Sequence, residues 1–67
     1  MKFSARNKLP GKVKEVKMGE VMAIVKVQVG DNLLESSITK DAAQDLGLKA
    51  GDDVTAVIKS TSVMVMK

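Results

Sequence analysis

Hydrophobic and polar residues alternate most clearly over residues 21–29, where the chain reads VMAIVKVQV. One face of this segment carries only small or branched apolar residues: Val21, Ala23, Val25, Val27 and Val29. The opposite face begins with Met22 and Ile24 and turns polar at Lys26 and Gln28. A period of two predicts a β-strand. The mixed second face predicts partial burial on both sides, as in a barrel strand that also meets a partner.

Turn residues bound this strand at both ends. Gly19 and Glu20 precede it, and residues 30–32 (Gly-Asp-Asn) follow it; these three residues tolerate positive φ or bond their own backbone. Pro10 and Gly11 indicate the end of a first strand rather than a linker. Further strands are predicted downstream at LLESSIT (33–39), VTAVIK (54–59) and VMVMK (63–67).

The segment TKDAAQDLGLK carries the signals of a short helix. Thr39 can cap its N-terminus, Asp41 is favourable in the first turn, and Gly47 suits the position after the C-cap. The apolar face of this helix consists of Ala42, Ala43 and Leu46. With about five strands and one helix between the third and fourth, we expect residues 1–67 to form one all-β domain, a small five-stranded OB-like barrel with one short helix.

Composition limits how such a domain is stabilised and what it can do. A chain of 67 residues buries only about 60% of the surface that its unfolded form exposes. It has no cysteine, so neither disulfides nor thiolate metal sites can stabilise it. It also has no histidine, the commonest general base and transition-metal ligand. A catalytic acid, base or nucleophile is therefore hard to find, and we expect neither an enzyme nor a metal site. The 45% apolar content predicts that copies of the chain share a core.

The charge of the chain favours an anionic partner. Eleven basic residues against eight acidic ones give a net charge of +3, but the lysines are spread along the chain instead of forming the stripe of a nucleic-acid binder. Single-stranded nucleic acid needs aromatic stacking platforms, and Phe3 is the only aromatic residue, so we expect no nucleic-acid partner. No apolar run reaches membrane-spanning length, and no secretory pattern opens the sequence. These features predict a soluble cytoplasmic protein.

Two short segments near opposite ends of the chain carry groups that bind oxyanions. SARN places Ser4 and Arg6 on one face of an extended segment, and IKSTS supplies Lys59 and Ser60. A tetrahedral oxyanion is held by guanidinium, ammonium, hydroxyl and backbone N–H donors from several directions, without a metal. The two segments can form one site if the first and fifth strands approach each other, or if one segment reaches across a subunit boundary.

Two further segments are candidate anion contacts. The turn over residues 17–20 contains Gly19, which lets backbone amides approach a ligand closely, although such a turn also serves as a plain hairpin connection. Ser36, Ser37 and Thr39 lead into the predicted helix. A helix N-terminus attracts anions, but hydroxyls at that place also serve as a cap.

The chain resembles the molbindins, small proteins that bind molybdate and tungstate through a domain also found in molybdate-responsive regulators and transporter ATPases. The resemblance spans residues 3–66, and its most specific elements are SARN, SIT ahead of LGLK-x-G, and AVIK followed by small hydroxyl residues and VMV. It implies an OB-like barrel in a homohexamer, a trimer of dimers. It also implies that molybdate or tungstate is held at subunit interfaces for molybdenum storage or homeostasis, with no cofactor.

Carried over by position, the resemblance implies two classes of oxyanion site. The first class is formed by Ser4, the amide of Ala5, Arg6, Lys59 and Ser60, and is completed by the backbone of Gly19, Glu20 and Val21 of a neighbouring subunit. The second class lies near a threefold axis and uses backbone and hydroxyl groups. The candidates for it are Ser36, Ser37, Ile38 and Thr39. Glu20 departs from the expected chemistry because it brings a negative charge close to the first site.

A DNA-binding role is the main alternative. The string ITKDAAQDLGLKAGDDV also resembles part of the swapped-hairpin domains of bacterial transition-state regulators and antitoxins, which are dimeric transcription factors. This resemblance covers about a quarter of the chain. It leaves SARN, the strand over residues 21–29 and the STS turn unexplained.

Overall fold

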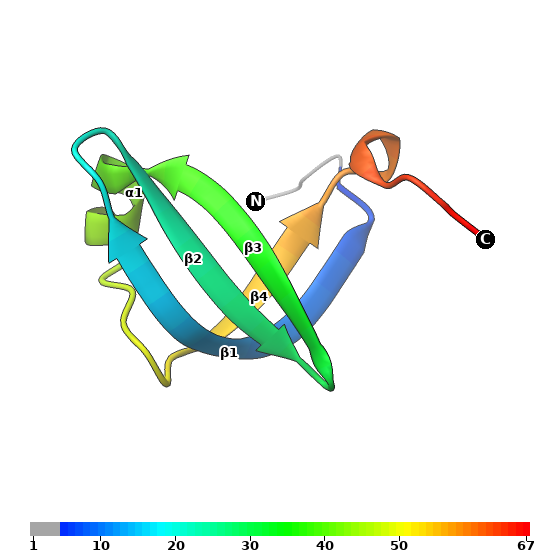
Figure 1. The fold of residues 1–67 in the computed structure, drawn as a ribbon, viewed down its shortest axis with the longest axis horizontal. Helices are drawn as coiled ribbons and strands as arrows, with labels where there is room; N and C mark the ends of the chain where they lie inside the picture. The colour runs from blue at the N-terminus through cyan, green and yellow to red at the C-terminus, as the bar shows by residue number, and fades with distance from the viewer. Residues whose placement is uncertain (1–4) are drawn as a thin grey trace.

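A computed structural model describes residues 5–67 as a small antiparallel sheet with one short helix (Figure 1). The elements in chain order are β1 (Asn7–Met18), β2 (Met22–Val29), β3 (Asn32–Thr39), α1 (Lys40–Asp45), β4 (Asp53–Ile58) and the 3-10 turn η1 (Ser60–Ser62). The strands lie in the order β3-β2-β1-β4. The predicted all-β class, with a short helix between the third and fourth strands, is confirmed.

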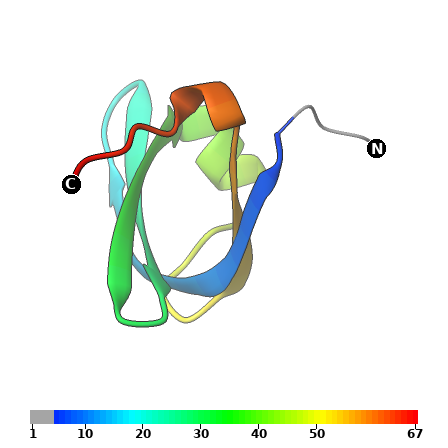
Figure 2. The same cartoon turned by 90° about the vertical axis from the view of Figure 1, so that its right-hand side faces the viewer.

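The long strand β1 organises the sheet because it pairs with two different strands. Its first half, Asn7–Lys12, pairs with β4, and its second half, from Lys12 to Met18, pairs with β2. An irregularity in the β1–β2 register lies between Val13 and Glu15, and such a bulge bends a strand. The sheet consequently curves into a U whose arms end in β3 and β4, with α1 at one end (Figure 2).

The prediction that the first strand ends at Pro10 and Gly11 is wrong, since β1 runs through both residues. At Pro10 the strand has β4 on one side and, among residues 5–67, no strand on the other, so the missing N–H of proline is tolerated there. Gly11 is required for a different reason. A Cβ at this position would collide with the carbonyl oxygen of Gln28, where β1 passes from one partner to the other.

The inner face of the U holds the core, as the alternation over residues 21–29 predicts. Ala23, Val25 and Val27 of β2 are buried together with Val13 of β1. Val21 is the exception, because it lies in the turn before β2 and is 72% exposed. Partly buried side chains from all four strands and the segment after α1 pack against the core: Val16, Val29, Leu34, Ile38, Leu48 and Val54.

The helix α1 has the predicted caps. The Thr39 hydroxyl oxygen accepts a hydrogen bond from the Ala42 amide at 3.0 Å. At the other end Gly47 takes φ of +60°, and the amides of Gly47 and Leu48 donate to the carbonyls of Gln44 and Ala43, the Schellman arrangement. Ala43 is completely buried, whereas the predicted face residue Leu46 is 69% exposed. The chain itself therefore covers only part of the apolar face of this helix.

The predicted fifth strand over residues 63–67 is absent from this single chain. The segment is extended at Val63 but belongs to no strand of the described structure, and all five of its residues are exposed. A strand needs a partner, and none of the three ladders in the described part of the chain includes these residues. The result is an open four-stranded sheet, while the apolar side chains of the C-terminal segment project away from the body of the chain.

Candidate functional site

The two segments that the sequence singles out meet at one end of the β1–β4 ladder. The last pair of this ladder joins Asn7, the first residue of β1, to Ile58, the last residue of β4. Arg6 directly precedes this pair and Lys59 directly follows it. Segments more than 50 residues apart in sequence thus leave the sheet side by side, on the right of Figure 1. The sequence left open whether the first and fifth strands approach each other or one segment reaches across a subunit boundary; within this chain, β4 is the strand that brings the two segments together.

A side chain strengthens this junction. The Asn7 amide nitrogen Nδ2 donates to the carbonyl oxygen of Ile58 at 3.3 Å, across the strand pair and in a partly buried place. Sequence reasoning assigned no role to Asn7. The only signal available was its place as the last residue of SARN.

The chain after β4 turns sharply and presents polar groups. Residues 60–62 form the 3-10 turn η1, in which the Ser62 amide donates to the Lys59 carbonyl at 2.9 Å. The first N–H groups of such a turn have no partner inside it, and within residues 5–67 the amides of Ser60 and Thr61 donate to no protein acceptor. The junction therefore offers backbone donors in the segment that directly follows Lys59.

The polar side chains at this junction are accessible. Arg6, Lys59 and Ser60 are exposed and Ala5 is half-buried, while Ser4 lies outside the described residues. A guanidinium, an ammonium, a hydroxyl and backbone amides all supply hydrogen-bond donors, and groups of these kinds bind anions.

The opposite end of the same ladder is closed by an ion pair. Lys12 and Asp53 are register partners, and the Lys12 ammonium lies 2.8 Å from the Asp53 carboxylate. The hydrogen bond to Asp53, together with the attraction between the two charges, raises the pKa of Lys12 above its usual value. Both groups are well exposed, so this pair belongs to the surface and not to a buried site.

The β1–β2 turn is the third predicted segment, and hydrogen bonds fix its shape. The Gly19 amide donates to the Met22 carbonyl at 2.8 Å, and the Val21 carbonyl accepts from the Lys40 amide at 2.8 Å. The Gly19 amide is therefore already used. The amides of Glu20 and Val21 have no protein acceptor within residues 5–67, and the residues of this turn are exposed.

The turn and the chain-end junction do not meet within one chain. Figure 1 places the β1–β2 turn beside α1 on the left and the paired ends of β1 and β4 on the right. The bond between Val21 and Lys40 fixes the turn to the helix end of the molecule. A site that uses both groups of donors needs two copies of the chain.

The four candidates for a second site lie on two different faces of β3. Ile38 pairs with Ala23 and Ser36 with Val25, so both belong to the inner, core face. Ser37 and Thr39 alternate with them and lie on the outer face. The Thr39 hydroxyl oxygen also caps α1. The hydroxyls that share a face are therefore those of Ser37 and Thr39.

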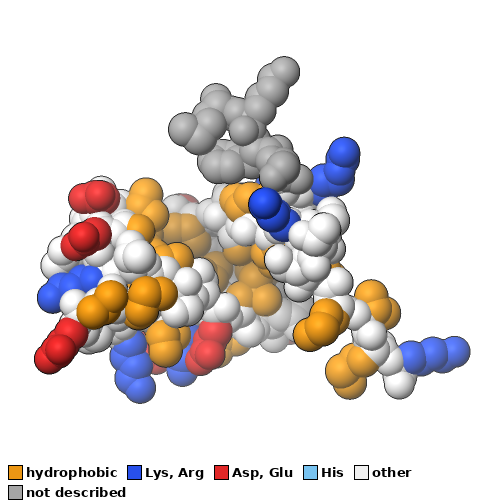
Figure 3. All heavy atoms as spheres, turned by 90° about the horizontal axis from the view of Figure 1, so that it is seen from above, with side chains coloured by type: hydrophobic (Ala, Val, Ile, Leu, Met, Phe, Trp, Pro, Cys, Tyr) orange, Lys and Arg blue, Asp and Glu red, His pale blue; other side chains and the backbone are white. Residues whose placement is uncertain are grey.

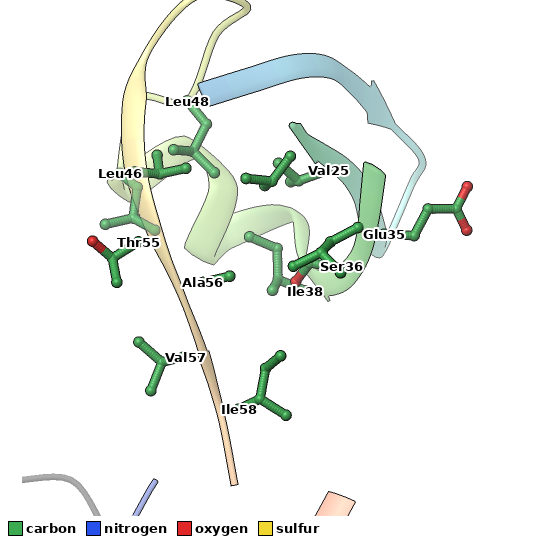
Figure 4. A pocket seen from close by; sticks show the side chains of 13 residues that line it. Val25, Glu35, Ser36, Ile38, Leu46, Leu48, Thr55, Ala56, Val57 and Ile58 are labelled. Carbon is green, nitrogen blue, oxygen red and sulfur yellow. The ribbon is translucent and has the colours of Figure 1, made fainter. Parts of the chain in front are cut away.

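An apolar groove that sequence reasoning missed runs between the two edge strands of the sheet. Its lining comes from β2, β3, β4 and the segment after α1: Val25, Val27, Leu34, Glu35, Ser36, Ile38, Leu46, Leu48, Val54, Thr55, Ala56, Val57 and Ile58. Ala56 and Ile58 point into the groove, while Thr55 and Val57 point to the other side of β4 and Glu35 points away (Figure 4). Figure 3 shows hydrophobic side chains in a hollow of the surface and further hydrophobic side chains along the C-terminal segment.

The described residues contain neither a metal-binding cluster nor a membrane-spanning helix. Residues 5–67 contain no cluster of three or more acidic or metal-ligating side chains that could hold a metal ion. No helix in this part of the chain has the length and apolar character needed to cross a membrane.

Comparisons of the sequence and of the structure with known proteins agree on one family. The TOBE domain model matches residues 4–65. Molybdenum-pterin-binding protein 3 of Clostridium pasteurianum is 49% identical over 67 residues, which cover 98% of each chain. The structure of a molybdate-binding protein from Sporomusa ovata superposes with a TM-score of 0.95 at 45% identity over 100% of both chains.

A third relative places the same fold inside a longer protein. The molybdate-bound structure of ModG, described as a cytoplasmic molybdate-binding protein, has a TM-score of 0.83 at 41% identity, covering 90% of this chain and 43% of that one. The family match spans nearly the whole chain, and the resemblance seen in the sequence is confirmed. The chain therefore belongs to the TOBE domain family and, within it, to the molybdenum-pterin-binding proteins.

Proposed function

We propose that this protein binds the tetrahedral oxyanions molybdate and tungstate without catalysing a reaction. The observation that carries the proposal is the β1–β4 register, which ends at Asn7 and Ile58 and so places Arg6 beside Lys59. A doubly negative tetrahedral ion accepts hydrogen bonds from every side, and this junction presents a guanidinium, an ammonium and backbone N–H groups. The names of the Sporomusa ovata protein and of ModG, both molybdate-binding, support the choice of ligand.

The predominance of hydrogen-bond donors in the proposed site also favours molybdate over phosphate. Hydrogen phosphate carries a proton that needs an acceptor, so a site lined by donors leaves one donor facing that proton and disfavours phosphate. Sulfate carries the same charge as molybdate but is smaller, and a cavity sized for the larger ion rejects it by leaving gaps. In this proposal the anion is a ligand and not a cofactor.

The second half of the site comes from a neighbouring copy. The amides of Glu20 and Val21 have no acceptor within residues 5–67 and sit in a turn fixed by the bonds of Gly19 and of Val21. In our proposal these amides reach the anion held by Ser4, the Ala5 amide, Arg6, Lys59 and Ser60 of the adjacent subunit. The Glu20 carboxylate lies close to this position and lowers the affinity without abolishing it.

Self-association also completes the barrel. The groove between β3 and β4 is apolar, and Leu46 is 69% exposed beside it. The extended segment Val63–Met66 carries Met64 and Met66, which are 93% and 94% exposed. A single chain of this size gains stability by covering such surface with another copy. We propose that the fifth strand of the OB-like barrel forms between subunits, within a homohexamer built as a trimer of dimers.

A second class of anion site lies on the outer face of β3 in this proposal. The hydroxyls of Ser37 and Thr39 share that face, and the Thr39 hydroxyl can still donate its proton while its oxygen caps α1. Ser36 and Ile38 contribute to this site only through their backbone. Copies of this face gathered around a threefold axis would surround one anion with equivalent donors.

The biological role that fits is storage or buffering of molybdate in the cytoplasm. ModG, a relative described as cytoplasmic, supports the compartment. The alternative, a DNA-binding regulator, gains nothing from the structure: α1 spans only six residues and buries Ala43, and the relatives match nearly the whole chain rather than the helix-plus-turn string alone.

Native mass spectrometry with and without molybdate tests the proposal directly. We expect a hexamer that gains a fixed, small number of anions, and isothermal titration that ranks molybdate and tungstate above sulfate and phosphate. A protein that stays monomeric and takes up no molybdate would refute both the ligand and the assembly. Equal affinity for all four anions would refute the selectivity argument alone.

A further inference from the structure

Asn7 occupies the boundary between the sheet and the proposed anion site. It is half-buried, and its Nδ2 donates to the Ile58 carbonyl oxygen, its register partner, at 3.3 Å. No further ladder pair follows it on the side of Arg6 and Lys59. This side-chain bond is therefore the last cross-strand hydrogen bond before the two chain segments separate, within the described residues.

The bond acts on the peptide group that leads into Lys59. Because the peptide unit is planar, fixing the direction of the Ile58 carbonyl also fixes the Lys59 amide and the path by which the chain leaves β4. Asn7 is also the residue that directly follows Arg6 in the chain. One side chain thus ties together the two backbone segments that carry the guanidinium and the ammonium.

We propose that Asn7 is a positioning residue for oxyanion binding: it contacts no anion itself and holds Lys59, and the 3-10 turn after it, in the orientation that binds one. This inference rests on the proposed function. The residue type fits the task, since a neutral amide supplies an N–H donor to a carbonyl, whereas aspartate would supply only acceptors and a repelling negative charge. Preorganised donors bind a charged group more strongly than donors that must be ordered on binding.

A double-mutant cycle between Asn7 and Lys59 tests the inference. Titration with molybdate should give about a three- to tenfold loss of affinity for Asn7→Leu. In a Lys59→Ala background the same substitution should change affinity by less than about twofold, because the group that it positions is already gone. Asn32→Leu, at the start of β3 by the β2–β3 turn, is the matched control and should leave affinity unchanged.

The outcomes separate the inference from the function on which it rests. Equal losses from Asn7→Leu in both backgrounds would mean that Asn7 acts only through general stability, and would overturn the inference. Unchanged affinity for Asn7→Leu would do the same. Wild-type protein that binds no molybdate would overturn the proposed function itself, and the positioning role with it. If Asn7→Leu does not fold, Asn7→Ala replaces it in the same cycle.

Discussion

Asn7 and Ile58 form the last pair of the β1–β4 ladder, and the Asn7 side-chain amide donates a hydrogen bond to the Ile58 backbone carbonyl oxygen. This relationship explains how a chain of 67 residues can build a charged site from its two ends. The register of an antiparallel ladder determines which residues leave its end together. Arg6, before β1, and Lys59, after β4, therefore become neighbours in space although they are far apart in sequence.

Removal of either cationic side chain should weaken molybdate binding strongly. We expect Arg6→Ala and Lys59→Ala each to reduce affinity about ten- to a hundredfold, because hydrogen bonds to charged groups are worth about 1.5–3 kcal/mol. Both residues are exposed, so the assembly should persist. Isothermal titration measures the affinity, and native mass spectrometry checks the assembly. Lys49→Ala, an exposed lysine in the loop after α1, is the control; an equal loss there would show that only net charge matters.

Gly19→Ala should damage the β1–β2 turn although the position does not need positive φ. A Cβ there would lie 2.7 Å from the Met22 carbonyl oxygen, the acceptor of the bond that closes the turn. Backbone must shift to relieve such a contact, at a cost of about 1–3 kcal/mol. Thermal unfolding should show the loss of stability, and titration should show weaker molybdate binding.

Glu20→Ala in the same turn is the matched variant. It keeps the backbone amide and removes a negative charge from the proposed site, so affinity should stay equal or rise. If Glu20→Ala weakened binding as much as Gly19→Ala, the carboxylate and not the backbone would be the functional group of this turn.

Substitutions at Thr39 distinguish its role as the cap of α1 from its proposed role as an anion ligand. Thr39→Val removes the acceptor of the Ala42 amide and should cost about 1 kcal/mol of stability. In the proposed second site it should also lower the number of anions bound per assembly, counted by native mass spectrometry. Thr39→Ser retains the hydroxyl and should preserve both properties. An unchanged anion count in Thr39→Val would reduce Thr39 to a helix cap and remove it from the site.

The ion pair at the far end of the ladder should respond to pH and not to molybdate. The folded-state pKa of Lys12 is raised above its usual 10.5 by Asp53, so the pair stabilises the fold fully below pH 10.5 and loses this contribution as the pH rises through the raised pKa. Lys12→Met should therefore lower the unfolding temperature slightly at pH 7 and have no effect near pH 12. Thermal unfolding at both pH values measures the difference. A difference that grew with pH would contradict this assignment.

Local patterns predicted the elements whose causes are local. The alternation over residues 21–29 predicts β2 and its buried face, and Thr39 and Gly47 predict the two ends of α1. Pro10 and Gly11 misled because their local preferences mark a change of strand partner rather than a strand end. The strand register could not be read from the sequence, because no local pattern shows which residues of two strands lie opposite each other. The role proposed for Asn7 depends on its pairing with Ile58, so it could not be predicted either.

The C-terminal segment shows the same limit more strongly. VMVMK has the composition of a strand, yet strand formation depends on a partner, and no strand within residues 5–67 pairs with residues 63–67. The apolar groove was likewise invisible in the sequence, since its walls come from strands on opposite edges of the sheet. In the proposed assembly both features contact a second copy, and one sequence read alone describes only one copy.

Removal of the C-terminal segment should break the assembly. A chain that ends at Ser62 lacks Met64 and Met66, the most exposed apolar side chains of its tail, and we expect it to leave the groove between β3 and β4 uncovered. Size-exclusion chromatography with light scattering should report a smaller species than the wild type, and molybdate binding should fall because the turn of a neighbouring copy is lost. A chain that lacks only Lys67 is the control and should assemble normally. If the chain ending at Ser62 formed the same assembly as the wild type, the tail would not bridge subunits, and the exposed groove would need another occupant.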